Sequence, residues 1–132
     1  MSEEIYLLSV EEVVEIPADQ IARYGGEPAT RDEGLLASAV HASQNVAAYL
    51  EGADLCDMAA AYMFHIAENQ PFVDGNKRTA VASTLVFLHQ NGIEVMDPTE
   101  ALFDAMIKVA EKVIGKSEIA VVLRELISLT AQ

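Results

Sequence analysis

The chain has 132 residues, of which 52% are apolar and 22% are charged, so it can bury the core of one compact domain without disulfides or a structural metal. This composition excludes a disordered chain, a collagen-like repeat and a disulfide scaffold. Eight Lys and Arg residues stand against 21 Asp and Glu, which gives a formal net charge of −13. Because such an acidic domain repels a phosphate backbone, direct DNA binding is not expected, and any anion must be held locally.

We expect a cytoplasmic protein with no membrane partner. The single cysteine, Cys56, forms no internal bridge, which is typical of a reducing compartment. The acidic opening of the chain lacks the basic-then-apolar pattern of an export signal. The longest apolar runs of the whole chain are far shorter than the roughly 18 residues that suggest a membrane span.

Helix signals dominate the chain from its start. Ser9 and Glu12 form a capping box ahead of a first helix. That helix should break or kink near Pro17, because an internal proline removes a backbone donor and costs about 3 kcal/mol. It should resume beyond the proline and stop at Gly25-Gly26.

Five further helices follow from caps, prolines and glycines, at residues 32–50, 55–69, 76–91, 98–114 and 117–129. Asp54 is the expected cap of the helix at residues 55–69. At the start of the helix at residues 98–114, the fifth of the chain, Asp97 is the expected cap and Pro98 occupies the first helical position. Residues 5–8 and 93–96 are the only strand-like segments. The predicted fold is therefore all-α, a compact bundle of about six helices in one domain over residues 1–132, with at most a small hairpin.

The stretch from Gln70 to Ala80 is the part of the sequence that indicates chemistry. Gly75 allows a sharp turn, and the backbone N–H groups after it have no helical partners at the start of the next helix. The helix dipole, Lys77 and Arg78 together make an anion site suited to phosphate. Asp74 beside it is a hard oxygen ligand of the kind that Mg²⁺ bound to a nucleotide needs.

An ordinary turn explains the same residues without any ligand. Asp-Gly-Asn is a common turn, Asp74 or Asn76 is able to cap a helix, and Lys77 and Arg78 would then be solvated. The residues alone leave both interpretations open.

The residues Pro71-Phe72-Val73-Asp74-Gly75-Asn76-Lys77-Arg78-Thr79-Ala80 closely resemble the signature of the Fic/Doc family, His-x-Phe-x-(Asp/Asn)-(Ala/Gly)-Asn-Lys-Arg, in its Doc (death-on-curing) branch. The resemblance extends to residues 22–26, 31–36 and 86–92 and covers roughly residues 5–125. It implies a helical bundle with the motif loop between two central helices. It also implies a toxin that uses Mg-ATP to modify a hydroxyl group of a target protein.

The resemblance also suggests which group is transferred. Most Fic proteins transfer AMP, whereas the Doc branch, with Lys in place of a glycine, resembles a kinase that phosphorylates elongation factor Tu. Lys77 therefore favours phosphoryl transfer to a translation factor, with AMP transfer as the alternative, and Val81 stands where the Fic pattern has a trailing arginine. Carried over by position, Asp74 holds Mg²⁺, and the phosphates are held by Gly75, Asn76, Lys77 and Arg78.

Gln70 is the main departure from the family, because it stands in the position of the histidine that acts as general base. A glutamine side chain cannot accept a proton at neutral pH. Loss of a general base typically lowers a rate by about 10²–10⁴-fold, so the chain should be weakly active or inactive. We do not expect His65, five residues earlier on a helix, to substitute, and the three histidines lack metal-site spacing.

Pro17, where many relatives carry a histidine, is a second departure. Two readings remain open. Either the chain was inactivated, deliberately or by selection, because an active toxin kills its host, or it is a natural degenerate member. In the second case it is a catalytically dead interaction module that still binds a nucleotide or a partner.

An antitoxin acting in trans is the partner that the resemblance implies. The sequence has no Ser/Thr-x-x-x-Glu-(Gly/Asn) helix, which blocks the ATP site of self-inhibited Fic proteins. Inhibition would then come from an antitoxin that folds a helix into a groove of the toxin. The loop that contains Gly52 and Asp54 is either a flap that docks the target or an ordinary connector.

Overall fold

A computed structural model describes residues 5–27, 29–97 and 100–130 of the chain. Over these residues the fold is all-α, as predicted, with a single isolated bridge between Thr30 and Phe72 in place of any sheet. The six helices are α1 (Val10–Tyr24), α2 (Glu33–Tyr49), α3 (Leu55–Asn69), α4 (Asn76–Gln90), α5 (Ala101–Ala110) and α6 (Lys116–Thr130). None of the helices in the described ranges is long and apolar enough to cross a bilayer.

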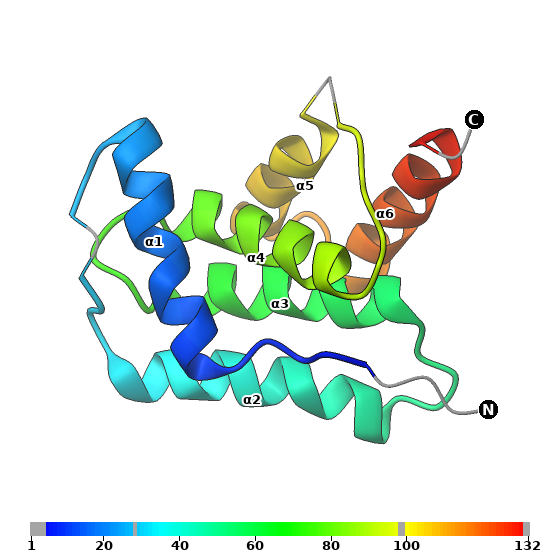
Figure 1. Ribbon diagram of the computed structural model, residues 1–132, viewed down its shortest axis with the longest axis horizontal. Helices are drawn as coiled ribbons and strands as arrows, with labels where there is room; N and C mark the ends of the chain where they lie inside the picture. Colours follow the sequence, from blue (N-terminus) through cyan, green and yellow to red (C-terminus); the bar gives the residue numbers. More distant parts are fainter. Residues whose placement is uncertain (1–4, 28, 98–99, 131–132) are drawn as a thin grey trace.

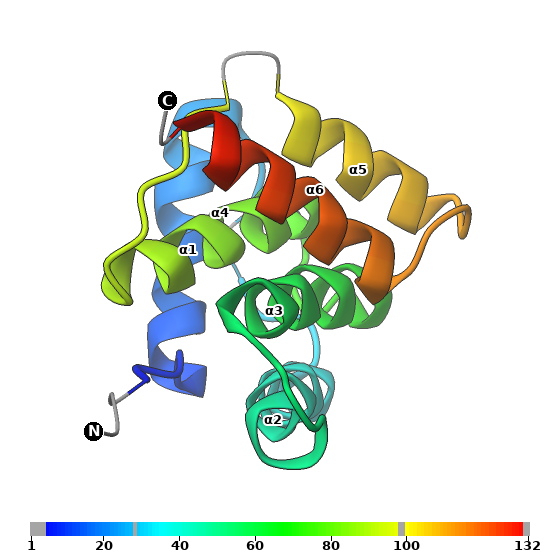
Figure 2. The ribbon, with the colours of Figure 1, turned by 90° about the vertical axis from the view of Figure 1, so that its right-hand side faces the viewer.

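The central element is α3, which packs against α2, α4, α5 and α6 (Figures 1 and 2). Its composition explains this place, because it is rich in alanine and methionine and Ala59, Ala60 and Ala61 are fully buried. Small side chains let neighbouring helices approach closely. The outermost helix on one side, α1, lies across α4, while α2 lies on the other side of α3 (Figure 1).

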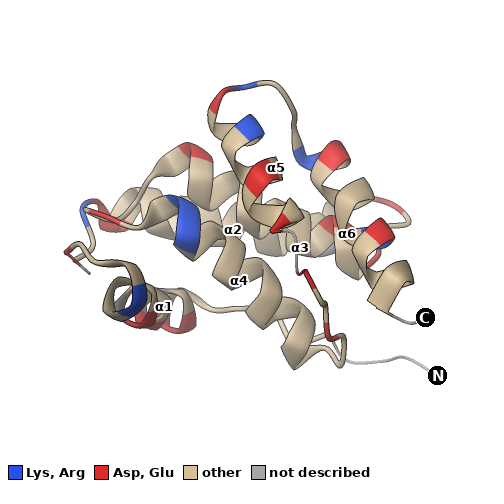
Figure 3. Ribbon diagram, turned by 90° about the horizontal axis from the view of Figure 1, so that it is seen from above, with Lys and Arg blue, Asp and Glu red and all other residues tan. Residues whose placement is uncertain are grey.

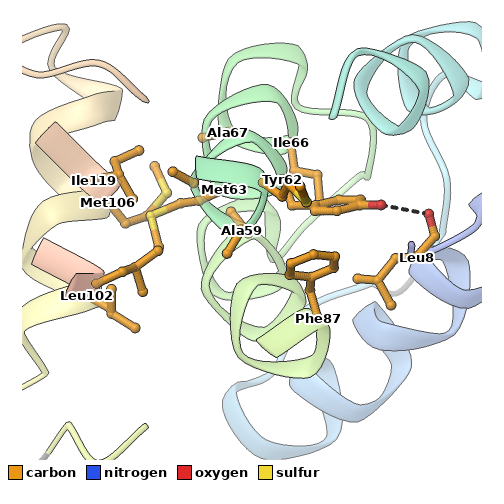
Figure 4. Close-up of a cluster of buried hydrophobic side chains, with 14 of the residues drawn as sticks. Leu8, Ala59, Tyr62, Met63, Ile66, Ala67, Phe87, Leu102, Met106 and Ile119 are labelled. Carbon is orange, nitrogen blue, oxygen red and sulfur yellow. Dashed lines mark hydrogen bonds between the residues drawn. The ribbon is translucent and has the colours of Figure 1, made fainter. Parts of the chain in front are cut away.

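The largest buried side chains surround α3 and tie the N-terminal segment to it (Figure 4). The rings of Tyr62 and Phe87 lie 5.3 Å apart between centroids. The Tyr62 hydroxyl donates a hydrogen bond of 3.0 Å to the carbonyl of Leu8, which is fully buried. Burial raises the pKa of the Tyr62 hydroxyl far above its usual range, so this donor stays protonated at physiological pH.

Of the break or kink predicted near Pro17, the break is wrong, because α1 runs from Val10 to Tyr24 as one helix. Val13 and Pro17 are both buried, one turn apart, on the face of α1 that packs against the bundle. The packing of this face compensates for the hydrogen bond that a proline cannot donate. The capping box at Ser9 and Glu12 is present as predicted.

The predicted bounds of the fifth helix are also wrong, since α5 begins at Ala101 and ends at Ala110. Asp97 does cap it, but from further away, by accepting hydrogen bonds from the amides of Ala101 and Leu102. Pro98, the expected first residue, lies outside the described residues. At the other end Lys112 adopts a left-handed φ of 62° and closes a Schellman motif, a position where glycine is the usual signal.

The small hairpin proposed for residues 5–8 and 93–96 does not form in the described part of the chain. Tyr6 instead pairs with the side chain of Asn91, which accepts from its amide at 2.9 Å and donates to its carbonyl at 3.0 Å. A side-chain amide therefore takes the place that a neighbouring strand would have filled.

Candidate functional site

The loop between α3 and α4 ends one helix and begins the next with two left-handed residues. Gln70 follows α3 with a φ of 46°, and Gly75 precedes α4 with a φ of 77°. Gly75 provides no side-chain cap for α4, and its carbonyl accepts the first helical hydrogen bond, from the amide of Thr79. The amides of residues 76–78 therefore have no partner within the helix and remain available to a ligand.

Asn76 holds the loop in shape. Its side chain accepts from the Phe72 amide and donates to the Phe72 carbonyl, both at 3.0 Å. Phe72 is almost fully buried, so it anchors the loop to the core. The Asn76 side chain is thus used inside the loop, and its backbone amide is the group that remains available to a ligand.

Arg31 fixes the end of α3 from a distant part of the sequence. Its guanidinium donates to the carbonyls of Asn69 and Gln70, at distances of 2.8 to 3.2 Å. The amides of Arg31 and Asp32 both donate to the carbonyl of Pro71. A cation at the C-terminal end of a helix is favourable because it meets the negative end of the helix dipole. The sequence indicated Arg31 only through the family resemblance, so this role at the end of α3 was not predicted.

A cavity of about 330 Å³ lies in front of the loop and the first turn of α4. The structure brings all the residues that sequence analysis assigned to the site to the wall of this cavity: Gln70, Asp74, Gly75, Asn76, Lys77 and Arg78. The opposite wall, formed by Phe103, Met106 and Ala110 of α5, was not predicted. Viewed from above, the blue turn at the start of α4 lies between α1 and α5 (Figure 3).

Asp74 is held so that one carboxylate oxygen stays available. Its Oδ2 accepts a hydrogen bond of 3.0 Å from the amide of Glu27. Gly26 lies against it, and a Cβ at Gly26 would come within 2.9 Å of the Asp74 Cβ, which explains why a glycine is needed there. Among the described residues nothing hydrogen-bonds to Oδ1.

The Asp74 carboxylate beside the cavity is suited to a Mg²⁺ ion that would arrive with a nucleotide. In the described part of the chain no group of three or more His, Cys, Asp or Glu residues is placed to hold a metal ion by itself. Mg²⁺ commonly binds through one or two carboxylates together with phosphate oxygens and water. Asp74 beside the open end of α4 provides such a carboxylate.

The two cations of the motif have different surroundings. Arg78 stacks on the rings of Tyr24 and Phe103, with its Cζ at 4.3 and 3.8 Å from the ring centroids. Its Nη1 also lies 3.3 Å from Oε1 of Glu100. Lys77 is exposed, and no described residue forms an ion pair with it.

The histidines lie elsewhere. His65 is half-buried on α3, with its Nε2 at 3.3 Å from Nζ of Lys116. Burial and the neighbouring Lys116 charge lower the pKa of His65 to about 4. His41 is exposed on α2, and His89 pairs with Glu94. None of the three lines the cavity that Gln70 lines, so the structure brings no histidine to the position of the missing base.

Comparison with known proteins identifies the family of the chain. The sequence profile of the Fic/DOC family matches residues 7–88, from the segment before α1 to the end of α4. The chain therefore belongs to the Fic/DOC family.

Two relatives place it within the family. The chain is 38% identical over 119 residues to the "Protein kinase doc" of Escherichia phage P1, and the match covers 90% of this chain and 94% of that protein. It is also 46% identical over 76 residues to the "Toxin Doc" of Mycolicibacterium smegmatis, which covers 54% of this chain and 56% of that protein. These similarities confirm the Doc branch that the motif indicated.

Proposed function

We propose that this chain is a Doc-type toxin domain that binds ATP and Mg²⁺ in the cavity before α4. The family reaction in this site is phosphoryl transfer to a hydroxyl group of a translation factor, elongation factor Tu by resemblance, in the cytoplasm. The observation that carries the proposal is the gathering of one carboxylate, two cations and the uncapped end of α4 around a single cavity of about 330 Å³. The naming of a phage relative as a protein kinase supports phosphate as the transferred group.

Each residue has a role that follows from its position. Lys77, Arg78 and the amides of residues 76–78 bind phosphate oxygens, and Asp74 binds the Mg²⁺ ion. The bound ion supplies further neutralisation of phosphate charge. Phosphoryl transfer depends mainly on positioning and electrostatic stabilisation, so a site without further nucleophiles is adequate for it.

Gln70 limits the reaction. It lines the cavity at the position where the family has its general base, but its amide cannot accept the proton of the target hydroxyl. In the transfer the oxygen of the target hydroxyl attacks the γ-phosphorus of ATP, and the bond from that phosphorus to the bridging oxygen breaks to release ADP. The proton of the hydroxyl then passes to water. Without a base at this position we expect turnover to be about 10²–10⁴-fold below that of a histidine-bearing form.

Gln70 also favours a second candidate function, that of a catalytically dead interaction module. Such a module keeps the fold and binds its antitoxin but transfers nothing. The phosphate-binding cations and the carboxylate would then serve nucleotide binding alone.

Restoring the base in Gln70→His tests these alternatives. We expect growth arrest on expression of the histidine form, relief by co-expression of a cognate antitoxin, and little arrest by the chain as it stands. Label from γ-labelled ATP should reach the translation factor; label from α-labelled ATP instead would show AMP transfer. If neither label is transferred and neither form arrests growth, the enzyme proposal is wrong and the interaction module is favoured.

A further inference from the structure

Arg78, on the first turn of α4, is held by two aromatic rings. The ring of Tyr24 approaches it from the end of α1, and the ring of Phe103 approaches it from α5. Both rings lie within 4.3 Å of its Cζ, which is well inside the range of a cation–π contact. We call Tyr24 and Phe103 the aromatic clamp.

The clamp leaves the donor edge of the guanidinium accessible. Stacking uses the faces of this planar group, whereas hydrogen bonds to an anion use its edge. One such bond is present, from Nη1 of Arg78 to the Glu100 carboxylate at 3.3 Å. A carboxylate oxygen therefore already reaches this edge while both rings are in place.

We propose that Tyr24 and Phe103 are positioning residues that hold the Arg78 guanidinium in the plane needed to bind a nucleotide phosphate. This inference rests on the proposed function, since it assumes that the cavity takes ATP. An unrestrained arginine has many rotamers and loses that freedom when it binds, so a side chain already fixed by two rings binds its phosphate at a smaller entropic cost. Phe103 also lines the cavity, so the clamp forms part of its wall.

Lys77 provides an internal comparison. It adjoins Arg78 in sequence and lines the same cavity, but it is exposed and stacks on no ring among the described residues. An ammonium group has no plane to orient, so its contribution to phosphate binding does not depend on the clamp. The proposal therefore predicts that loss of the rings affects binding through Arg78 and leaves the effect of Lys77 intact.

Calorimetric titration of the full chain with ATP and Mg²⁺ tests the clamp. The variants are Tyr24→Leu, Phe103→Leu and their combination, with Tyr24→Phe and Phe103→Tyr as variants that keep a ring. Tyr49→Leu, an exposed tyrosine at the far end of α2, is the matched control. Thermal unfolding of each variant verifies that it is folded; because Tyr24 is 59% exposed, its replacement should leave the fold intact.

We expect the Kd for ATP to rise about tenfold in the double leucine variant, less in each single variant, and hardly at all in the ring-keeping variants and Tyr49→Leu. In an Arg78→Ala background the same leucine substitutions should have no further effect, because the rings act through Arg78. Arg78→Lys should also weaken binding although it keeps the charge. In a Gln70→His background the KM for ATP should rise while kcat changes little.

The two proposals fail in different ways. If the leucine variants bind ATP normally while Lys77→Ala weakens binding, the clamp is overturned and the proposed function stands. Equal effects of the leucine substitutions with and without Arg78 also overturn the clamp. No measurable binding of ATP by the unaltered chain overturns both.

Discussion

The N-terminal ends of α3 and α4 lie in the same bundle, but side chains cap the first and leave the second uncapped. At α3, Asp54 accepts from the amide of Asp57 at 2.9 Å, Asp57 accepts from the amide of Asp54 at 3.0 Å, and Arg124 pairs with both carboxylates. At α4 the cap position is Gly75, which has no side chain to offer, and the first turn holds two cations and no acid.

This difference gives the two helix ends different uses: the α3 end stabilises the fold, and the α4 end is available to a ligand. The first amides of any helix carry partial positive charge and need acceptors. The α3 end obtains them from its own side chains, which typically stabilises a protein by about 1 kcal/mol per cap. The α4 end forgoes that stabilisation, and its amides stay free for an external anion.

The largest expected effect comes from giving α4 the kind of cap that α3 already has. Gly75→Asp places a carboxylate at the α4 cap, where it competes with phosphate for the free amides and repels it. We expect the affinity for ATP and Mg²⁺ to fall about 100-fold, since hydrogen bonds to charged groups are worth about 1.5–3 kcal/mol each. Calorimetry measures the change.

Gly75→Asn is the control for this substitution. Asn has the same shape as Asp and also tolerates a left-handed φ. Both side chains meet the same tight contact, because a Cβ at Gly75 lies 3.3 Å from Cδ1 of Ile21. Equal losses of affinity in the two variants would mean that backbone strain, not charge, accounts for the effect.

Lys77→Ala should lower the affinity for ATP about tenfold, because it removes one full charge from the uncapped end of α4. Lys116→Ala removes an equivalent charge from the first residue of α6, away from the cavity, and should leave the affinity unchanged. A similar loss in both variants would show that ATP responds only to net charge, which would contradict a local phosphate site.

At the capped end, Asp54→Ala should lower the free energy of unfolding by about 1–2 kcal/mol and leave ATP binding unchanged. Asp54→Asn keeps a capping side chain but removes the charge, so its loss should be smaller. Chemical denaturation measures both. A loss of ATP affinity in Asp54→Ala would show that the two helix ends are coupled after all.

The α3 cap should also respond to pH. Partial burial raises the pKa of Asp54, but hydrogen bonds from Arg124 and the Asp57 amide outweigh it and leave the pKa below its usual value. A lowered pKa means that the stabilisation is present above the pKa of the unfolded chain and is lost as the pH falls through that of the folded chain. The stability difference between Asp54→Ala and the unaltered chain should therefore shrink below about pH 4.

Glu100→Gln is the smallest expected effect and acts in the opposite direction. The Glu100 carboxylate is 64% exposed and lies at the donor edge of Arg78, where it would compete with the phosphate of the proposed ligand. Exposed ion pairs are worth about 1 kcal/mol or less, so the affinity for ATP should rise about threefold. Unchanged or weaker binding would show that Glu100 does not occupy the edge of Arg78 that phosphate uses.

The sequence predicted those parts of this comparison that depend on local signals. Asp54, Gly75 and the motif cations lie next to the helix ends they influence, so caps and turns could be recognised from neighbouring residues. The predicted break at Pro17 failed because the packing of α1 on α4 outweighs a local proline penalty.

The rest of the site depends on contacts between distant segments, which periodicity and caps do not reveal. Phe103 and the α5 wall of the cavity lie beyond the family match at residues 7–88. Tyr24 meets Arg78 across 54 positions of sequence, and nothing in the sequence around either residue indicates a stacked pair. The early end of α5 likewise rests on Lys112 in a position where glycine was the expected signal.

The hydrogen bonds from Arg31 and Asp32 to the loop carbonyls limit how the motif could be transferred to another protein. The signature from Gln70 to Ala80 is contiguous in sequence, but its shape depends on a segment about 40 residues upstream as well as on Asn76 within it. A graft of the motif and its two flanking helices into another bundle would keep the amino-acid sequence of the loop but lose the hydrogen bonds that hold its conformation. For this architecture, a transferable motif loop needs α3, α4 and the segment at residues 29–32, and a transferable cavity needs α5 as well.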